Sequence, residues 1–267
     1  MKREYENLHS HTCYCDGKNT VEEMVEMAIQ KGFGGLGFSG HGYFEPDSFT
    51  MNEETEKLYC QDILQAKEKY KDQIDIYLGI EEEYDGKQYS KDVYDFVIGS
   101  VHIVHKSVDD TKAIMQEELE EYYHGDFKAY ARDYYAKVAK YADREEADII
   151  GHIDLLMKFN EDESFCKFDD PEYLKSAYAC IDSLIAAHKI FEINTGAIAR
   201  GYRKTPYPHS TLLKYIYEHG GKICINSDCH NKDFMDCAFD QAYDLARKAG
   251  FTTKMILTAN GFQEVEL

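Results

Sequence analysis

The sequence predicts an α/β fold, namely one domain with a largely parallel sheet that closes as a barrel. Buried apolar segments of strand length alternate with amphipathic segments of helix length along the whole chain. Seven or eight strand and helix units can be counted, and this number favours a barrel over an open sheet. The 267 residues include only four prolines, and no linker, repeat or low-complexity segment divides them. We therefore expect a single domain over residues 1–267.

The first unit begins with a strand at residues 5–8. The helix after it starts at a capping box formed by Thr20 and Glu23, and its apolar residues recur at helical spacing. Gly32 follows the last periodic residue and is a typical helix C-cap. A second buried strand at 35–39 completes the order strand, helix, strand.

The following units repeat this order as far as the last residues. Towards the middle of the chain we expect a polar loop around Pro46, a helix over about 53–71, strands at 74–80 and 96–101, a helical stretch over about 111–142 and a strand at 149–150. Asp170 and Pro171 then form an N-cap and N1 pair that opens another helix. The remaining expected elements are a strand at 190–193, a helix after Pro208 that ends at His219, a strand at 222–225, a helix over about 236–249 and a last strand at 255–257.

Composition narrows the class of protein. The chain carries 50 Asp and Glu against 30 Lys and Arg, a formal charge of −20 at pH 7, and its sequence pI is about 4.9. A chain of this charge repels polyanions, so we expect no nucleic-acid partner. Bound divalent cations would cancel part of the negative charge locally, and a small phosphate ester therefore stays compatible with the composition.

We expect a cytoplasmic protein without a membrane segment. No apolar run approaches the ~20 residues needed to cross a bilayer, and the start of the chain lacks the apolar segment of a secretory signal. The eight cysteines are scattered and form no CxxC pair, which favours reduced thiols. Cys13 and Cys15 lie close to the candidate metal ligands and are either small buried side chains or ligands themselves. The sequence does not specify an oligomeric state.

A pair of histidines follows the first expected strand. His9 and His11 come directly after it, and Asp16 lies five residues further along in the loop. All three side chains can project over the same end of the sheet, and two histidines at i and i+2 can bind the same metal ion. Such a pair is also found at ordinary polar strand ends, so the interpretation depends on whether the pattern is repeated.

The pattern is repeated after five further strands. Scattered surface histidines have no reason to follow successive buried strands, whereas a site at the C-terminal mouth of a barrel draws its ligands from many strand ends. The repeated residues are His41 in Ser39-Gly-His41-Gly, Glu81 in Gly79-Ile-Glu81, His102 in Gly99-Ser-Val-His102, His152 in Gly151-His152-Ile-Asp154, and Asp228 with His230 in Ser227-Asp228-Cys-His230.

Together these nine residues predict a metal site. Nine ligands exceed the roughly four to six positions of one ion, so we expect two or three divalent ions that share a bridging carboxylate. Glu81 is the candidate for the bridging residue. Mixed imidazole and carboxylate ligands suit Zn²⁺, Mn²⁺ or Fe, and the lack of a thiolate-rich set argues against a closed structural zinc site.

In this order, and across nearly the whole chain, the series resembles the PHP (polymerase and histidinol phosphatase) family. The resemblance implies a distorted, TIM-like (β/α)₇ barrel with a trinuclear metal site at the C-terminal end of the strands. It also implies how the ligands divide among the ions: His9, His11, Glu81 and Asp228 for the first, Glu81, His102 and His152 for the second, and Asp16, His41 and His230 for the third.

Two features depart from the family pattern. The family often has an acidic residue just before the histidine that corresponds to His41, whereas this chain has Gly40. Phosphatases of the family also use basic residues to hold the substrate phosphate, and the candidates here are Lys158, Arg200 and Arg203, although exposed loop arginines are also ordinary. The family residue at the position of Lys158 is commonly Arg, and Lys neutralises a phosphate as a point charge without forming the bidentate fork.

The resemblance implies a metal-dependent phosphatase. We expect it to hydrolyse a small phosphate ester, L-histidinol phosphate, to L-histidinol and phosphate in histidine biosynthesis, with a metal-activated hydroxide attacking phosphorus. We expect Glu81, Asp228 and His230 to be essential for catalysis. The same chemistry on a phosphotyrosyl protein, a sugar phosphate or a nucleotide phosphodiester stays an alternative, as does a metal-binding protein without turnover. We expect His124, His188, His209 and His219 to be ordinary. His105 is expected to be a solvated loop histidine, and the alternative is a role behind a metal ligand or facing the substrate.

Overall fold

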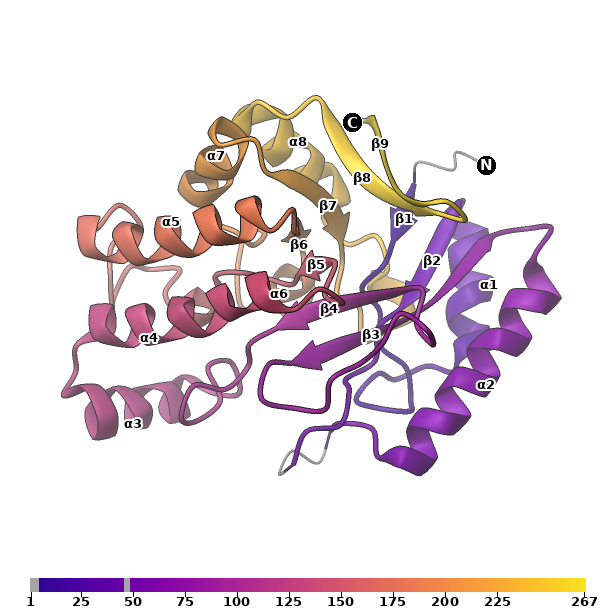
Figure 1. Cartoon of the computed structure of the whole chain (residues 1–267), viewed down its shortest axis with the longest axis horizontal. Coiled ribbons are helices and arrows are strands. Elements are labelled where there is room, and N and C mark those ends of the chain that lie inside the picture. The colour runs from indigo at the N-terminus through magenta and orange to yellow at the C-terminus, as the bar shows by residue number, and fades with distance from the viewer. Residues whose placement is uncertain (1–4, 46–48) are drawn as a thin grey trace.

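The computed structural model describes residues 5–45 and 49–267, so the predicted loop around Pro46 lies partly outside the described residues. The described chain forms a sheet of seven parallel strands in sequential order, with helices packed around its outside (Figure 1). The strands of this sheet are β1 Glu6–Asn7, β2 Gly35–Phe38, β3 Asp75–Glu83, β4 Phe96–Ser100, β5 Ile149–Ile150, β6 Ile190–Asn194 and β7 Lys222–Asn226. The predicted (β/α)₇ barrel is therefore confirmed.

The barrel closes between β1 and β7 through side chains rather than through a continuous backbone ladder. The Oδ1 atom of Asn226 in β7 accepts a hydrogen bond from the Leu8 N–H at 2.8 Å. Beyond the strand ends, the His11 N–H donates to the Cys229 carbonyl at 3.0 Å. This closure brings the loop after the first strand beside the loop after the last, although more than 200 residues separate them.

The helices agree with the local signals in the sequence. Thr20 and Glu23 form the predicted capping box, and Gly32 ends the first helix in the left-handed region at φ 81°. The principal helices are α1 Val21–Lys31, α2 Glu53–Tyr70, α3 Lys112–Tyr123, α4 Phe127–Ala139, α5 Pro171–Ala186, α6 Gly196–Ala199, α7 Ser210–Glu218 and α8 Phe239–Ala249. None of the helices in the described part of the chain combines the length and the apolar character required to span a bilayer.

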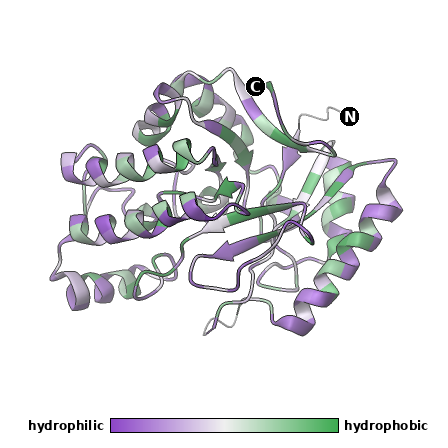
Figure 2. Ribbon diagram, viewed as in Figure 1, coloured by the Kyte–Doolittle hydropathy of each residue, from purple (hydrophilic) through white to green (hydrophobic). Residues whose placement is uncertain are grey.

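Three predicted boundaries were wrong. The helical stretch over 111–142 is two helices, because His124 and Gly125 both adopt positive φ angles, 51° and 79°, and reverse the chain. The last helix begins at Phe239 rather than near residue 236. The third strand continues past residue 80 to Glu83, and its C-terminal end is drawn in purple in Figure 2 because three consecutive glutamates lie there.

The last predicted strand lies outside the barrel sheet. It is β8, Thr253–Thr258, and it pairs antiparallel with β9, Gly261–Glu266, which the sequence analysis did not predict. Apolar side chains of β8 pack against the residues that fill the barrel interior, among them Phe96, Ile98 and Ile149. The residues of β9 are mostly exposed and polar, so the sequence has no buried apolar pattern that would predict this strand.

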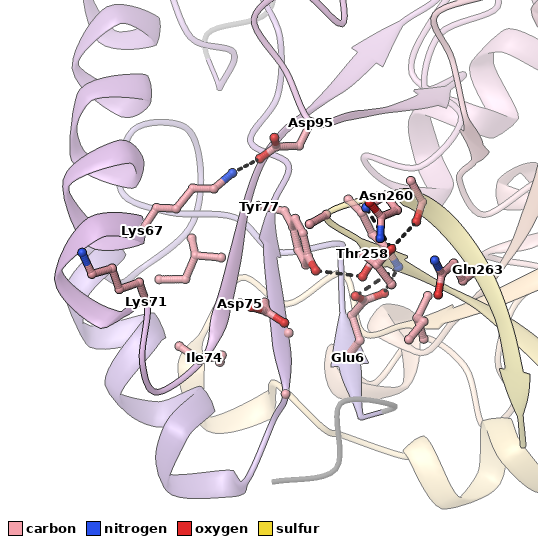
Figure 3. A pocket seen from close by; sticks show the side chains of 17 residues that line it. Glu6, Lys67, Lys71, Ile74, Asp75, Tyr77, Asp95, Thr258, Asn260 and Gln263 are labelled. Carbon is pink, nitrogen blue, oxygen red and sulfur yellow. Dashed lines mark hydrogen bonds and ion pairs between the residues drawn. The ribbon is translucent and has the colours of Figure 1, made fainter.

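A pocket of about 520 Å³ lies beside this hairpin, at the end of the barrel where the strands begin (Figure 3). Its lining includes Glu6, Lys67 and Tyr77. The Tyr77 hydroxyl donates to the Leu257 carbonyl at 2.8 Å, and Lys67 pairs with Asp95 at 2.7 Å. None of the nine predicted metal ligands lines it, so the candidate site must be sought at the opposite end of the strands.

Candidate metal centre

The structure brings all nine predicted ligands together at the C-terminal end of the barrel. Each lies in a loop after a strand, except Glu81, which lies within β3 because that strand is longer than predicted. Among the described residues, four overlapping groups each have nitrogen and oxygen atoms within 4.8 Å of one another. The groups are His9 with His11 and Asp228; His9 with Glu81 and His152; His41 with Glu81 and His102; and His11 with Asp16, His41 and His230.

The Glu81 carboxylate occupies the centre of the cluster. Its Oε2 atom lies 3.1 Å from His41 Nδ1 and 3.3 Å from His9 Nε2. Its Oε1 atom lies 3.1 Å from His152 Nε2 and 3.5 Å from His102 Nε2. His11 Nε2 also lies 3.5 Å from Oε2. Because the two oxygens face different sets of histidines, this carboxylate has the geometry of a bridge between two ions.

Several atoms of the centre are buried without a hydrogen-bond partner among the described residues. They include Nε2 of both His9 and His11, and Oε2 of Glu81. Asp228 Oδ1 lies 3.3 Å from His11 Nε2 and 3.7 Å from His9 Nε2. Unsatisfied buried polar atoms are costly, and imidazole and carboxylate lone pairs that converge in this way match the requirements of a divalent cation. The residues present therefore fit the metal ions that the resemblance implies.

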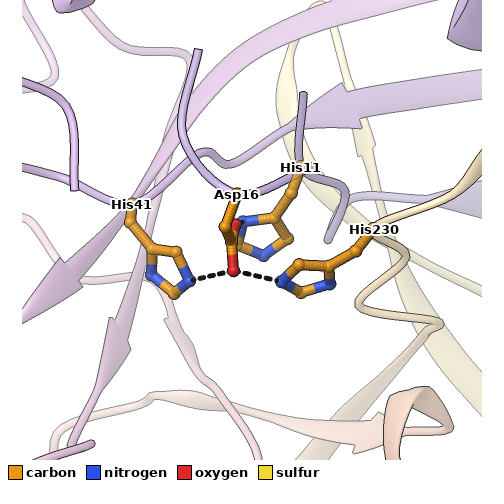
Figure 4. A group of neighbouring side chains, drawn as sticks. All are labelled: His11, Asp16, His41 and His230. Carbon is orange, nitrogen blue, oxygen red and sulfur yellow. Dashed lines mark ion pairs between the residues drawn. The ribbon is translucent and has the colours of Figure 1, made fainter. Parts of the chain in front are cut away.

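A second part of the centre, drawn in Figure 4, is more open to solvent, because the side chains of Asp16 and His230 are 32% and 21% exposed. Asp16 projects between two histidines, with Oδ2 2.9 Å from His230 Nε2 and 3.7 Å from His41 Nε2, and Oδ1 lies 3.4 Å from His11 Nδ1. Burial alone raises the pKa of the Asp16 carboxyl, but hydrogen bonds from His11 and His230 outweigh burial and hold that pKa well below its ordinary value. Asp16 is consequently an anion at neutral pH and suits a third ion.

The position of Gly40 is closely surrounded. A Cβ atom added there would lie 3.2 Å from a Met51 atom and 3.3 Å from both Cys15 Sγ and a Tyr59 ring carbon. An acidic side chain at this position would require its neighbours to move. Cys15 Sγ lies 3.6 Å from His11 Nδ1, yet no cysteine belongs to the metal-binding groups found among the described residues. The surroundings of Asp16 and His41, where the resemblance implies a third ion, therefore differ from the common family pattern.

A pocket of about 490 Å³ opens onto the metal ligands. Two of the three predicted phosphate-binding residues, Lys158 and Arg200, line it. The Arg200 guanidinium donates to Asp228 Oδ2 at 3.0 Å and contacts His230 Nδ1 at 3.1 Å. The Lys158 ammonium donates to the Asp109 carbonyl at 2.5 Å and lies 3.1 Å from the Asp109 carboxylate. The pocket wall thus places two cations beside the acidic and imidazole ligands.

Arg203 lies elsewhere. It does not line the pocket, its side chain is buried, and its guanidinium carbon lies 4.4 Å from the ring centre of Tyr207. Its Nε atom is 3.5 Å from the carboxylate of Glu161. The Arg203 side chain therefore packs within the loop and does not face the pocket that opens onto the metal ligands.

Two carboxylates behind the histidines were missed by the sequence analysis. Glu83 accepts a hydrogen bond from the His102 N–H at 2.7 Å and lies 3.2 Å from His102 Nδ1. Glu192 lies 2.7 Å from His9 Nδ1. Both are acidic residues inside otherwise buried strands. This pattern could have identified them from the sequence, because a buried carboxylate requires hydrogen-bond donors or a cation.

A parallel barrel whose strand ends carry a shared carboxylate and converging imidazoles defines a class of metal-dependent hydrolases. The chain belongs to the PHP domain family, whose model matches residues 7–196. With this family and this site, the chain is a metal-dependent phosphoesterase of the PHP type.

Individual relatives resemble the chain over most of its length. It is 26% identical over 272 residues to a probable histidinol-phosphatase of Schizosaccharomyces pombe, covering 92% of this chain and 87% of the relative. It is 27% identical over 269 residues to the histidinol-phosphatase of Lactococcus lactis subsp. lactis, covering 94% and 93%. A solved histidinol phosphate phosphatase from Lactococcus lactis subsp. lactis, in complex with zinc, L-histidinol and phosphate, has the same fold, with a TM-score of 0.74 at 23% identity and coverage of 97% and 99%.

Proposed function

We propose that the chain is a histidinol-phosphate phosphatase that hydrolyses L-histidinol phosphate to L-histidinol and phosphate. The observation that carries the proposal is the Glu81-centred cluster of buried ligands, which opens onto a pocket walled by Lys158 and Arg200. The choice of substrate is supported by relatives named histidinol-phosphatase that align with more than nine-tenths of the chain. The related structure that holds zinc, L-histidinol and phosphate together supports it further.

In this proposal the nine ligands hold up to three ions of Zn²⁺, Mn²⁺ or Fe. When bound, such ions activate a water molecule for attack on phosphorus and neutralise charge on the phosphate oxygens. The family resemblance implies these ligand sets: His9, His11, Glu81 and Asp228; Glu81, His102 and His152; and Asp16, His41 and His230. The groups in the structure differ in that His41 also lies with Glu81 and His102.

Arg200 and Lys158 bind and orient the phosphate. The contacts of Arg200 with Asp228 and His230 use three of the five N–H groups of a guanidinium, which leaves donors for substrate oxygens. Lys158 adds a point charge held in place by Asp109. Their positive charges offset the charge that accumulates on the phosphoryl oxygens in the transition state.

Phosphate release from L-histidinol phosphate tests this function. Protein of known metal content is assayed with L-histidinol phosphate, para-nitrophenyl phosphate, a phosphotyrosyl peptide and a sugar phosphate. We expect a much higher kcat/KM for L-histidinol phosphate than for the other esters. Equal rates on all esters, or selective cleavage of another one, would refute the substrate assignment, and bound metal without any hydrolysis would favour the non-catalytic alternative.

Variants test the roles of individual side chains in the same assay. Asp228→Ala and His152→Ala remove one ligand each and are expected to abolish turnover. His219→Ala serves as the matched control, because this exposed histidine ends α7 and stacks on Tyr215. Unchanged kcat in either ligand variant would contradict the metal assignment.

A further inference from the structure

Glu192 is a buried acidic residue that none of the proposed ligand sets uses. It lies in the middle of β6, and its side chain has no exposed surface. Four nitrogen atoms surround its carboxylate: Oε1 is 2.7 Å from His9 Nδ1 and 3.0 Å from Asn226 Nδ2, and Oε2 is 2.9 Å from the His152 backbone nitrogen and from Asn194 Nδ2. The carboxylate therefore joins residues of β6 and β7 to the loops after β1 and β5.

The orientation of these donors is determined by other contacts. Asn194 Oδ1 accepts a hydrogen bond from the Gly196 N–H at 2.8 Å, and Asn226 Oδ1 accepts one from the Leu8 N–H at 2.8 Å. Each asparagine must therefore present its amide NH₂ group to Glu192. The backbone N–H of His152 is a donor by nature. Three of the four nitrogen atoms around the carboxylate are therefore donors. An ionised carboxylate can only accept hydrogen bonds, so His9 must carry a proton on Nδ1 to match.

We propose that Glu192 is a positioning residue that holds His9 with its proton on Nδ1 and thereby presents the lone pair of Nε2 to the metal centre. In this orientation His9 Nε2 faces Glu81 Oε2 at 3.3 Å and Asp228 Oδ1 at 3.7 Å. The inference depends on the metal centre in the proposed function and is independent of the identity of the phosphoester.

The same carboxylate acts on a second ligand. Its hydrogen bond to the His152 N–H fixes the backbone of that residue, whose Nε2 lies 3.1 Å from Glu81 Oε1. His9 and His152 thus face different oxygens of Glu81, and both hydrogen-bond to Glu192. Carboxylates that hydrogen-bond to ligating histidines fix the ring orientation and make the ligand more basic, and their loss typically lowers metal affinity by about 10- to 100-fold.

The first test uses the wild-type, zinc-loaded protein. Histidine-selective ¹⁵N NMR reports which ring nitrogen of each histidine carries a proton, and the His9→Gln variant assigns the His9 signals by their loss. We expect the His9 proton on Nδ1, in a strong hydrogen bond that protects it from exchange with solvent. A proton on Nε2, or a His9 ring proton that exchanges as fast as that of exposed His219, would overturn the inference.

The second test is zinc affinity measured by competition with a chromophoric chelator. Glu192→Gln keeps the shape of the side chain but turns an NH₂ group toward two of the four donors, so we expect affinity to fall about 10- to 100-fold. Glu6→Gln is the matched control, because Glu6 is an equally buried carboxyl that binds the Leu257 N–H away from the metal ligands. Affinity within twofold of wild type in Glu192→Gln would overturn the inference.

The two tests remain informative if either the variant or the function fails. If Glu192→Gln does not fold, the wild-type NMR spectrum decides the question without it. Neither measurement uses a phosphoester. Protein that passes both tests but does not cleave L-histidinol phosphate would contradict the proposed substrate and leave the role of Glu192 intact.

Discussion

Replacement of Glu6 by Gln should remove a pH-dependent loss of stability. Glu6 lies in β1, it is 4% exposed, and both of its carboxyl oxygens face the Leu257 N–H, at 3.0 and 3.2 Å (Figure 3). Burial raises the pKa of its carboxyl from 4.5 to about 8, although the Leu257 hydrogen bond and nearby Lys254 oppose this change. The folded protein therefore holds a proton on Glu6 at pH values where the unfolded chain has released it.

The sign and size of the effect follow from these two pKa values. A group whose pKa is raised by folding contributes stability below pH 4.5 and loses that contribution as the pH rises through about 8. Each unit of difference between the folded and unfolded pKa corresponds to about 1.4 kcal/mol, so the free energy of unfolding changes by about 5 kcal/mol in total. About 4 kcal/mol of it falls between pH 5 and pH 9.

Urea unfolding of metal-saturated wild type and Glu6→Gln measures this difference. The amide of Gln can still accept from the Leu257 N–H but does not titrate, so the other ionisable groups cancel when the two proteins are subtracted. We expect the stability of the variant relative to wild type to increase by about 4 kcal/mol from pH 5 to pH 9. A difference that stays constant within about 1 kcal/mol over this range would refute the reasoning.

Three further predictions concern the metal centre and its support. Gly196→Ala should lower zinc content and kcat/KM without loss of secondary structure, because the new Cβ would lie 2.9 Å from Asp228 Oδ2. Zinc content and activity equal to those of wild type would contradict the assigned geometry. Tyr59→Phe should reduce the free energy of unfolding by about 1–3 kcal/mol, because the buried hydroxyl donates to the Gly79 carbonyl and accepts from the Gly40 N–H. A loss below about 0.3 kcal/mol in urea unfolding would argue against these two hydrogen bonds. Removal of zinc by a chelator should lower Tm, because an ion that binds only the folded state at 100 times its Kd stabilises it by about 2.7 kcal/mol; an unchanged Tm after complete removal would exclude a preformed site.

Local signals in the sequence predicted the parts of the fold that local contacts determine. The capping box of Thr20 and Glu23 was identified from residue type and spacing, and the structure contains both of its hydrogen bonds. The helix expected over 53–71 is Glu53–Tyr70, with Asn52 as its N-cap. In both helices the partners are at most three residues apart, so the sequence alone is enough to identify them.

The ligands could be recognised for a different reason. Parallel strands all end at one side of a barrel, so polar residues placed after successive strands must converge wherever the strands lie in the sequence. His9 and Asp228 are separated by most of the chain, yet both were predicted for the same site and their side chains lie 3.7 Å apart. The prediction needed only the order of the strands and no knowledge of distances.

Other features had no local signal. The antiparallel strand β9 is mostly polar and exposed, and only β8 lying against the barrel end gives it a partner. Arg203 and Arg200 lie three residues apart in one loop, but Arg200 faces the pocket and Arg203 is buried against Tyr207. A difference in side-chain direction within an irregular loop depends on tertiary packing, and spacing could not reveal it.

The sequence by itself therefore determined the class of fold, the residues that gather at the strand ends and the kind of chemistry they support, because strand order and residue type suffice for these. Only the tertiary structure decided which atoms meet: the two oxygens of Glu81 face separate sets of histidines, and Glu192 lies behind His9 with four donors around it. Hydrogen bonds and metal coordination depend on distance and direction within a few tenths of an ångström. Those quantities arise when remote segments pack together, and no single segment of the chain contains them.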